Sequence, residues 1–156
     1  MNLLKNILLV TIMMAASWSV DITDGCDLPD DPYTGYLHLT SDGSVLYKSP
    51  YAIGGFQFNV DGTTVSSGSG GDAAGAGFII QTMGDLVLAF SLSGSTIPAG
   101  CGTLVELALV GDATGLSGII VSDPTGGQLI FEYYVGDDTE LVADCSDEYP
   151  DCAANE

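Results

Sequence analysis

The sequence predicts an all-β protein, built as a two-sheet antiparallel sandwich of about nine strands. Short apolar runs alternate along the chain with clusters of Gly, Ser, Thr, Asp and Pro, which is typical of strands joined by turns. No segment keeps a helical spacing of apolar residues over several turns. The composition is 46% hydrophobic, which is enough to fill a core, and 156 residues allow one domain of ordinary size.

Nine segments of the chain carry the strand pattern. In chain order they are 36–40, 45–48, 54–60, 65–67, 78–81, 85–92, 102–110, 116–122 and 128–135. The connections contain residues that favour turns, among them Asp42-Gly43, Asp61-Gly62, Gly70-Gly71, Gly111-Asp112 and the segment 124–127. The Gly-rich segment 68–77 contains no phosphate-binding motif, and we expect it to form a tight, flat connection.

Alternation assigns side chains to the core or to the surface, because successive side chains of a strand point to opposite faces. In segment 54–60 the bulky set of Phe56, Phe58 and Val60 is predicted to face the core. The other predicted inward sets are Leu86, Leu88, Phe90 and Leu92; Val105, Leu107 and Leu109; and Leu129, Phe131, Tyr133 and Val135. The predicted outward residues include a small or uncharged group, namely Gln57, Asn59, Val87, Ala89, Ser91 and Thr103.

The first residues have the form of a secretory signal peptide, which we expect to span 1–19. Lys5 precedes an apolar run over 7–16, and the small residues Ala15, Ala16 and Ser17 then provide a cleavage zone that extends to Val20. This apolar run is too short to cross about 30 Å of hydrocarbon. The sequence therefore predicts a secreted protein, extracellular or at the cell surface, that is not inserted in the membrane after cleavage.

Acidic residues divide the rest of the chain into three parts. Five of them fall within 21–31 and eight within 137–156, while the long stretch between holds only eight more. We therefore expect an acidic lead over 20–35, the sandwich domain over 36–136 and an acidic, Cys-containing tail over 137–156. Both acidic ends are expected to be solvated.

The charge excludes two classes of partner. The chain has 21 acidic residues and only two basic ones, Lys5 and Lys48, which gives a formal net charge of −19. A surface this negative repels the phosphates of nucleic acids and of anionic lipids. We expect neither nucleic-acid binding nor electrostatic attachment to a membrane.

Four cysteines are expected to pair in an oxidising compartment. They are Cys26, Cys101, Cys145 and Cys152, and four cysteines allow three connectivities. Cys145 and Cys152 are close enough in sequence to close a short loop, so we expect Cys26 to pair with Cys101. Zinc binding is disfavoured because the chain has no Cys-x-x-Cys and only one His.

The order of motifs resembles that of cohesins. Residues 52–60, Ala-Ile-Gly-Gly-Phe-Gln-Phe-Asn-Val, are similar to the cohesin strand in which Gly and an aromatic-Gln-aromatic run precede an acidic turn. The segments 86–92, 97–104 and 116–122 follow in the cohesin order, and the resemblance extends over about 36–135. Two features depart from it: the opening strand region is short, and Val60-Asp61-Gly62 replaces the usual Tyr-Asp-Pro.

The resemblance implies a nine-stranded jelly roll related to carbohydrate-binding modules. It also implies a secreted module that binds a dockerin-like protein through one flat sheet face. Among the predicted outward residues, we expect Gln57, Asn59, Ser91 and Thr103 to contact the partner. A flat face without charge allows docking at a small desolvation cost.

Catalytic chemistry is not predicted, and we name no catalytic residue. The single His38 is expected on an outward strand face without a Gly-x-Ser-x-Gly motif, and Glu106 and Glu132 are expected to be solvent-facing acids. Two non-catalytic alternatives stay open: a carbohydrate-binding module that uses tyrosines to bind polysaccharide, and a self-associating structural subunit of an extracellular fibre or particle.

The acidic tail has two interpretations. It resembles the opening of Asp/Cys-rich extracellular repeats, and Asp144, Asp147 and Asp151 carry oxygen ligands that would suit calcium weakly. The chain lacks an Asp-x-Asp-x-Asp-Gly loop, so a solvated linker is the other interpretation. No other cofactor is expected.

Overall fold

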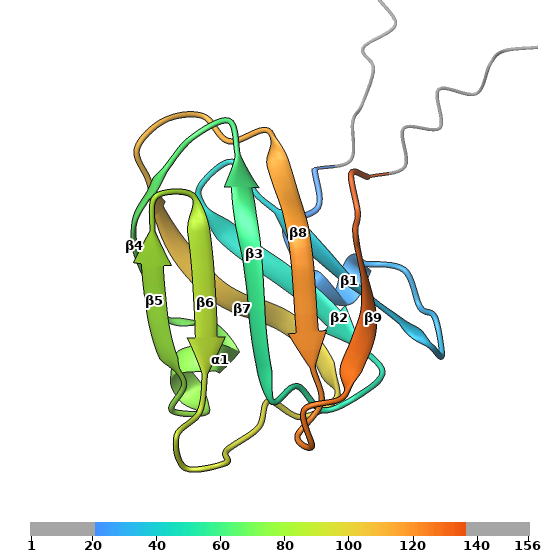
Figure 1. Ribbon diagram of the computed structural model, residues 1–156. Coiled ribbons are helices and arrows are strands. Elements are labelled where there is room, and N and C mark those ends of the chain that lie inside the picture. Colours follow the sequence, from blue (N-terminus) through green and yellow to red (C-terminus); the bar gives the residue numbers. More distant parts are fainter. Residues whose placement is uncertain (1–20, 137–156) are drawn as a thin grey trace, which may run out of the picture.

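The computed structural model describes residues 21–136 and confirms an all-β protein with nine strands (Figure 1). The strands are β1 (Thr34–Leu39), β2 (Ser44–Ser49), β3 (Gly55–Asp61), β4 (Val65–Ser69), β5 (Ile79–Met83), β6 (Leu86–Phe90), β7 (Gly100–Leu109), β8 (Gly115–Ser122) and β9 (Gln128–Tyr133). A 3-10 turn, η1 (Gly25–Asp27), precedes them, and a short helix, α1 (Gly71–Gly75), lies between β4 and β5. The predicted signal peptide, the Cys145 to Cys152 pair and the candidate calcium ligands Asp144, Asp147 and Asp151 lie outside the described residues.

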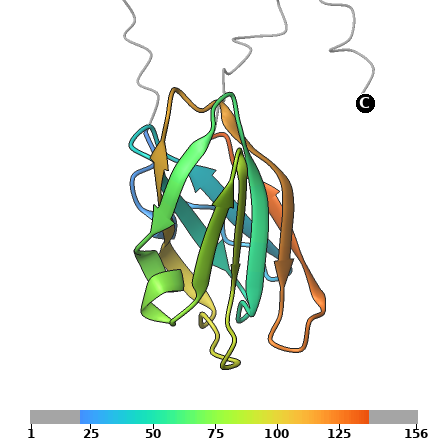
Figure 2. The same cartoon turned by 60° about the vertical axis from the view of Figure 1, so that its left-hand side comes forward.

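The strands form two packed layers that are joined along one edge (Figures 1 and 2). The strand order is β4-β7-β2-β1-β9-β8-β3-β6-β5, with β4, β7, β2 and β1 in one layer and β8, β3, β6 and β5 in the other. Strand β9 connects them, because it pairs with β8 over only two residue pairs and then lies against β1. The β1–β9 pairing is parallel, so the prediction of a wholly antiparallel sandwich was wrong at this edge.

The core lies between the layers, and the predicted inward set of β3 is confirmed. Phe56, Phe58 and Val60 are buried, and Phe58 has no exposed surface. The rings of Phe56 and Phe58 stack with their centroids 5.9 Å apart, and Phe78 stacks on Phe56 at 6.4 Å. These aromatic rings form the centre of the sandwich.

The predicted inward set of β6 was wrong. Val87 and Ala89 are fully buried, whereas Leu86, Leu88 and Phe90 point outward and are only half-buried. Ala89 pairs with Phe56 and Val87 with Phe58, so the small residues of β6 lie on the core side beside the large rings of β3. Bulky neighbours on one strand leave space for small ones on the next. Leu92 lies beyond the strand and is 80% exposed.

Three further differences have local causes. A register shift in the β2–β7 pairing places both Leu104 and Val105 in the core, although strict alternation with Val105, Leu107 and Leu109 predicts an outward Leu104. Val135 follows the end of β9 and is exposed rather than buried. The Gly-rich segment forms α1 instead of a flat connection. Gly71 permits this because its φ is +63° and a Cβ there would lie 2.5 Å from the Leu104 carbonyl oxygen.

The acidic lead is packed against the domain rather than solvated along its length. Ile22 and Leu28 are buried with Leu46 of β2 on the outer side of the β1–β2–β7 layer. The predicted disulfide between Cys26 and Cys101 is confirmed, with the two Cα atoms 4.9 Å apart. It attaches the lead to β7.

Lys48, on β2, holds the lead against the sheet. Its ammonium group donates to the carbonyl oxygens of Cys26, at 3.0 Å, and Leu28, at 2.9 Å. It also lies 2.8 Å from the carboxylate of Asp30. Lys48 is the only Lys or Arg in the described part of the chain, and its charge holds this segment in place.

A side-chain hydrogen bond attaches helix α1 to β2. The hydroxyl of Tyr47, on β2, donates to the Asp72 carboxylate at 2.7 Å. Burial, followed by this bond and the negative charge of Asp72, raises the pKa of Tyr47 well above its ordinary value of 10. The folded protein therefore holds the phenol proton more tightly than the unfolded chain does.

We expect Tyr47 to make stability fall at alkaline pH. Its contribution is fully present below about pH 10 and is lost as the pH rises further, since the unfolded chain then releases the proton first. Tyr47→Phe should cost about 1 kcal/mol near neutral pH, for one lost hydrogen bond, and should reduce the alkaline fall. Urea unfolding at about pH 8 and about pH 11 measures both effects. Equal alkaline losses in the two proteins would show that Tyr47 keeps an ordinary pKa.

Candidate docking face

The outward side of β5, β6, β3 and β8 forms one continuous surface, which we call the docking face. Strand pairing aligns its side chains in rows across the four strands. One row consists of Gln81, Leu88, Gln57 and Ile120. The rows on either side consist of Met83, Leu86, Asn59 and Ser117, and of Ile79, Phe90, Gly55 and Ser122.

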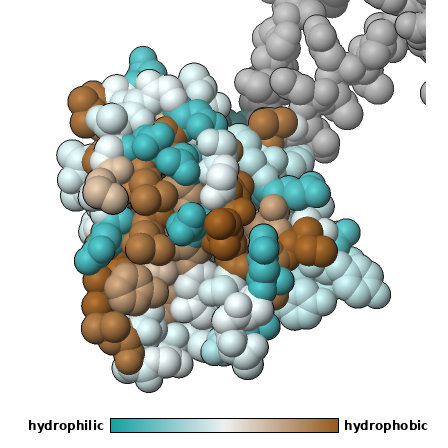
Figure 3. Space-filling view, in the orientation of Figure 1, coloured by the Kyte–Doolittle hydropathy of each residue, from teal (hydrophilic) through white to brown (hydrophobic). Residues whose placement is uncertain are grey.

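The docking face is largely apolar and open to solvent. Met83 is 74% exposed, Ile120 46% and Ile79 37%. Figure 3 shows apolar side chains gathered over this sheet with single hydrophilic residues between them. An open hollow of about 330 Å³ is lined by Gln81, Thr82, Met83, Leu86 and Leu88. Contiguous exposed apolar surface on a water-facing protein marks an interaction site.

Charge is confined to the border of the docking face. None of the three rows contains a charged residue. Asp61 lies at the end of β3, where its carboxylate accepts a 2.6 Å hydrogen bond from the Ser117 hydroxyl. Asp85 in the β5–β6 turn is exposed at the same end of the sheet, where its carbonyl oxygen accepts from the Val60 amide. The face is therefore a neutral surface inside an acidic border.

Asp123 belongs to the same border and fixes the β8–β9 turn. Its Oδ1 accepts hydrogen bonds from the hydroxyl and the amide of Thr125, both at 2.7 Å, and from the amide of Gly127 at 2.9 Å. The bond from the Thr125 hydroxyl, followed by the bond from the Gly127 amide, lowers the pKa of Asp123 below its ordinary range. This carboxylate is thus ionised at neutral pH.

A β-bulge keeps both halves of β8 on the docking face. Gln57 pairs with Ile120 and Asn59 with Ser117, so β8 contains one more residue than β3 between these pairs. Gly118 adopts a φ of +57° in the bulge, and a Cβ there would lie 2.9 Å from the Asn59 side-chain oxygen. The extra residue lets Ser117 and Ile120 both point outward.

The structure brings together two of the four residues predicted to contact a partner. Gln57 and Asn59 lie next to each other on the docking face. Ser91 follows β6, where its hydroxyl contacts that of Ser93 at 3.2 Å and accepts from the Ser95 amide at 2.9 Å. Thr103 lies on β7 in the other layer, opposite Leu46. Thr103 therefore does not share a face with Gln57 and Asn59.

Sequence reasoning missed the apolar part of the docking face. Alternation predicts that Leu86, Leu88 and Phe90 face the core, and it does not place Ile79, Met83 or Ile120 on a binding surface. The available signal was the size of the β6 residues, since the small Val87 and Ala89 suit positions beside Phe56 and Phe58. Such a match of sizes requires the strand pairing, which the sequence does not display.

The residues considered for catalysis do not assemble. His38 Nδ1 lies 2.8 Å from the Tyr134 carbonyl oxygen, and its ring stacks on Tyr133 with centroids 6.2 Å apart. Glu106 lies on β7 and Glu132 on β9, three strand spacings apart in the sheet order, or about 14 Å. That distance exceeds the separation of the paired carboxylates in glycoside hydrolases, which is about 5–9.5 Å.

Residues 21–136 contain neither a candidate metal site nor a helix that could span a membrane. No group of three or more His, Cys, Asp or Glu side chains there is placed to hold a metal ion. No helix in this part of the chain is long and apolar enough to span a membrane.

Comparison with known proteins finds similarity among solved structures. No family profile and no curated protein sequence matches this chain. Among solved structures, it is similar to a non-cellulosomal cohesin from the hyperthermophilic archaeon Archaeoglobus fulgidus, with 15% sequence identity and a TM-score of 0.43. The similarity covers 64% of this chain and 84% of the cohesin.

Proposed function

We propose that this chain is a secreted, non-catalytic module that docks a protein partner on the docking face. The observation that supports this proposal is the neutral, apolar surface of β5, β6, β3 and β8 on a protein with 21 acidic and two basic residues. Self-repulsion on such a protein keeps copies apart, so an exposed apolar face needs a separate explanation. Docking of a partner that covers it supplies one.

The choice of face follows from what covers the other one. The outer side of β1, β2 and β7 is occupied by the acidic lead, held there by the Cys26–Cys101 disulfide and by Lys48. Leu46, the apolar residue at its centre, is already buried under Ile22 and Leu28. The docking face has no comparable cover among the described residues. A disulfide of this kind also fits the oxidising compartment of a secreted protein.

The border defines the chemistry of the partner. Asp61, Asp85 and Asp123 lie around rows of neutral, mainly apolar side chains, so the matching surface is mainly apolar and has basic residues at its rim. A dockerin-like protein is the partner that the cohesin resemblance implies. A second copy of the chain is a poorer match, because both copies would bring acidic borders together.

The test replaces the two polar residues at the centre of the face. Gln57→Arg with Asn59→Arg should reduce capture of the partner by at least about 100-fold, because an unpaired charge buried in the interface costs about 3–5 kcal/mol. Both side chains point away from the core, so the melting temperature should stay within a few degrees of the wild type. Affinity capture from the native secretome with residues 20–156 as bait, followed by titration of the purified partner, measures the loss.

A matched control carries the same charges elsewhere. Ser67 and Ser69 of β4 also lie two residues apart, paired with Ala108 and Glu106 in the other layer. Ser67→Arg with Ser69→Arg should therefore bind the partner like the wild type. Unchanged affinity in the Gln57 and Asn59 variant would refute the docking face. Retention by polysaccharide without protein capture would favour the carbohydrate-binding alternative, and concentration-dependent dimers in sedimentation velocity would favour the structural subunit.

A further inference from the structure

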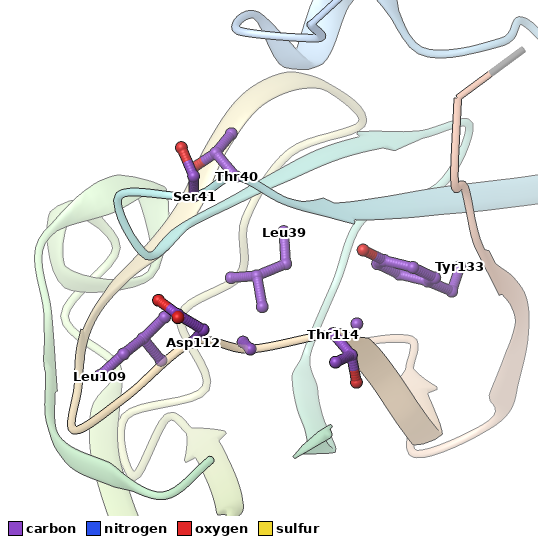
Figure 4. Close-up of a pocket in the computed structure, with 9 residues that line it drawn as sticks. Leu39, Thr40, Ser41, Leu109, Asp112, Thr114 and Tyr133 are labelled. Carbon is purple, nitrogen blue, oxygen red and sulfur yellow. The ribbon is translucent and has the colours of Figure 1, made fainter. Parts of the chain in front are cut away.

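A second concave site lies at one end of the sandwich, where the amide of Thr114 donates to the carbonyl oxygen of Asp61 at the border of the docking face. This end cavity, of about 380 Å³, opens between the β1–β2 turn, the β7–β8 loop and β9 (Figure 4). Six of its lining residues matter for its chemistry: Leu39, Ser41, Leu109, Asp112, Ala113 and Tyr133. None of them belongs to the rows of the docking face. Its volume lies in the lower part of the usual range for small-molecule sites, about 300–1,000 Å³.

The floor of the end cavity is apolar and its walls are polar. Leu39 lies at its centre in Figure 4, with Leu109 to one side. In the same view the hydroxyl of Tyr133 points toward Leu39, and the carboxylate of Asp112 lies on the opposite side of Leu39, beside Leu109. The Asp112 side chain has no hydrogen-bond or ion-pair partner among the described residues and is exposed. It is free to accept hydrogen bonds from a ligand.

Tyr133 is held in place as a donor. Its ring stacks on His38, and a backbone hydrogen bond from Leu39 reaches its hydroxyl. Burial of the ring outweighs this bond and raises the pKa of Tyr133 above its ordinary value. The phenol is thus protonated at neutral pH, and its hydrogen is available to an acceptor in the cavity. The end cavity offers an acceptor on one wall, a donor on the other and an apolar floor between them.

We infer that the end cavity binds a small, neutral, polyhydroxylated ligand, namely one sugar ring. Neighbouring hydroxyl groups of a sugar can donate together to the Asp112 carboxylate, while another accepts from Tyr133. The C–H surface of the ring covers Leu39 and Leu109. The hydroxyl of Ser41 at the rim adds a group that can either donate or accept.

Other ligand classes use this arrangement less well. An anion would meet the Asp112 carboxylate on a protein of net charge −19. A wholly apolar ligand would take that carboxylate out of water without a partner. A small cation would pair with one exposed carboxylate, a contact that contributes little, and would leave the Tyr133 donor unused.

The test is a titration of the isotope-labelled protein, residues 20–156, followed by amide NMR. Glucose, galactose, mannose and N-acetylglucosamine are the neutral probes, with methylammonium chloride and sodium acetate as charged probes. At least one sugar should give saturable shifts, in the millimolar range, at the amides of 39–41 and 112–115. Asp112→Asn and Tyr133→Phe should each weaken binding, by about tenfold for the charged acceptor. Asp85→Asn, a change of equal charge in the β5–β6 turn, should leave it unchanged.

Each alternative outcome is decisive. Absence of saturable shifts with all four sugars would overturn the inference, as would sugar binding unchanged in Asp112→Asn. Saturation by methylammonium or acetate alone would also overturn it. The Gln57→Arg and Asn59→Arg variant should bind the sugar like the wild type, because the end cavity and the docking face share none of these side chains. The inference therefore stands or falls separately from partner docking.

Discussion

Replacement of Phe58 by Ala is expected to lower the free energy of unfolding by about 3–5 kcal/mol. The Phe58 ring has no exposed surface and stacks on Phe56 at the centre of the sandwich. Its removal leaves a cavity that small neighbours such as Val87, which pairs with it across the sheet, cannot fill without moving the backbone. For a domain of this size such a loss is a large part of the total stability.

Urea unfolding monitored by circular dichroism measures this loss, and Gln57→Ala is the matched control. Gln57 precedes Phe58 on the same strand and points to the docking face, so its replacement should cost no more than about 0.5 kcal/mol. Similar losses in the two variants would contradict the assignment of faces along β3.

Loss of the Cys26–Cys101 disulfide should cost about 4 kcal/mol. The two cysteines are 75 residues apart, and a crosslink over so long a loop restricts the unfolded chain strongly. The disulfide also holds the acidic lead over Leu46, so its removal should let this segment open and expose the apolar cluster. Both effects, on the unfolded chain and on the packing of the lead, lower the free energy of unfolding.

Cys26→Ala with Cys101→Ala, compared with the wild type in urea, measures the effect without altering the other two cysteines. Amide hydrogen exchange should become faster in β2, beneath the lead, by a larger factor than in β6 in the other layer. A loss below about 1 kcal/mol with unchanged exchange in β2 would mean that Ile22, Leu28 and Lys48 hold the lead without the crosslink.

The number of strands and their positions along the sequence could be predicted because both depend on local signals. Gly and Asp turns separate short apolar runs, and each of the nine predicted segments overlaps a strand of the structure. The faces of β3 could be predicted as well. There the two sets of side chains differ plainly, with Phe56 and Phe58 on one side and Gln57 and Asn59 on the other.

The faces of β6 could not be predicted by the same reasoning. Both of its sets are apolar, with Leu86, Leu88 and Phe90 on one side and Val87 and Ala89 on the other. The larger set was assigned to the core, but pairing with Phe56 and Phe58 places the smaller set there. Because the two sides of β6 were exchanged in the prediction, the apolar half of the docking face was not predicted. A strand that is apolar on both sides is itself a sign that its outer side meets a partner.

Contacts between distant segments could not be predicted either. The parallel pairing of β1 with β9, and the packing of Ile22 and Leu28 on Leu46, join residues that no local pattern relates. The end cavity depends on such contacts too, because Leu39, Asp112 and Tyr133 come from three separate parts of the chain. The disulfide between Cys26 and Cys101 is the one long-range contact that the sequence predicted, because four cysteines allow only three sets of pairs.

Transfer of saturation from the captured partner to the methyl groups of this domain tests partner docking most directly. The sample is a complex of the methyl-labelled domain with an unlabelled, protonated partner. In this complex, saturation should reach the methyl groups of Ile79, Met83, Leu88 and Ile120, which line the docking face. The methyl groups of Ile22, in the acidic lead, and of Leu46, which the lead covers, should show none. Saturation confined to Ile22, Leu46 or the β4–β7 side, with none at Leu88 and Ile120, would contradict docking through β5, β6, β3 and β8.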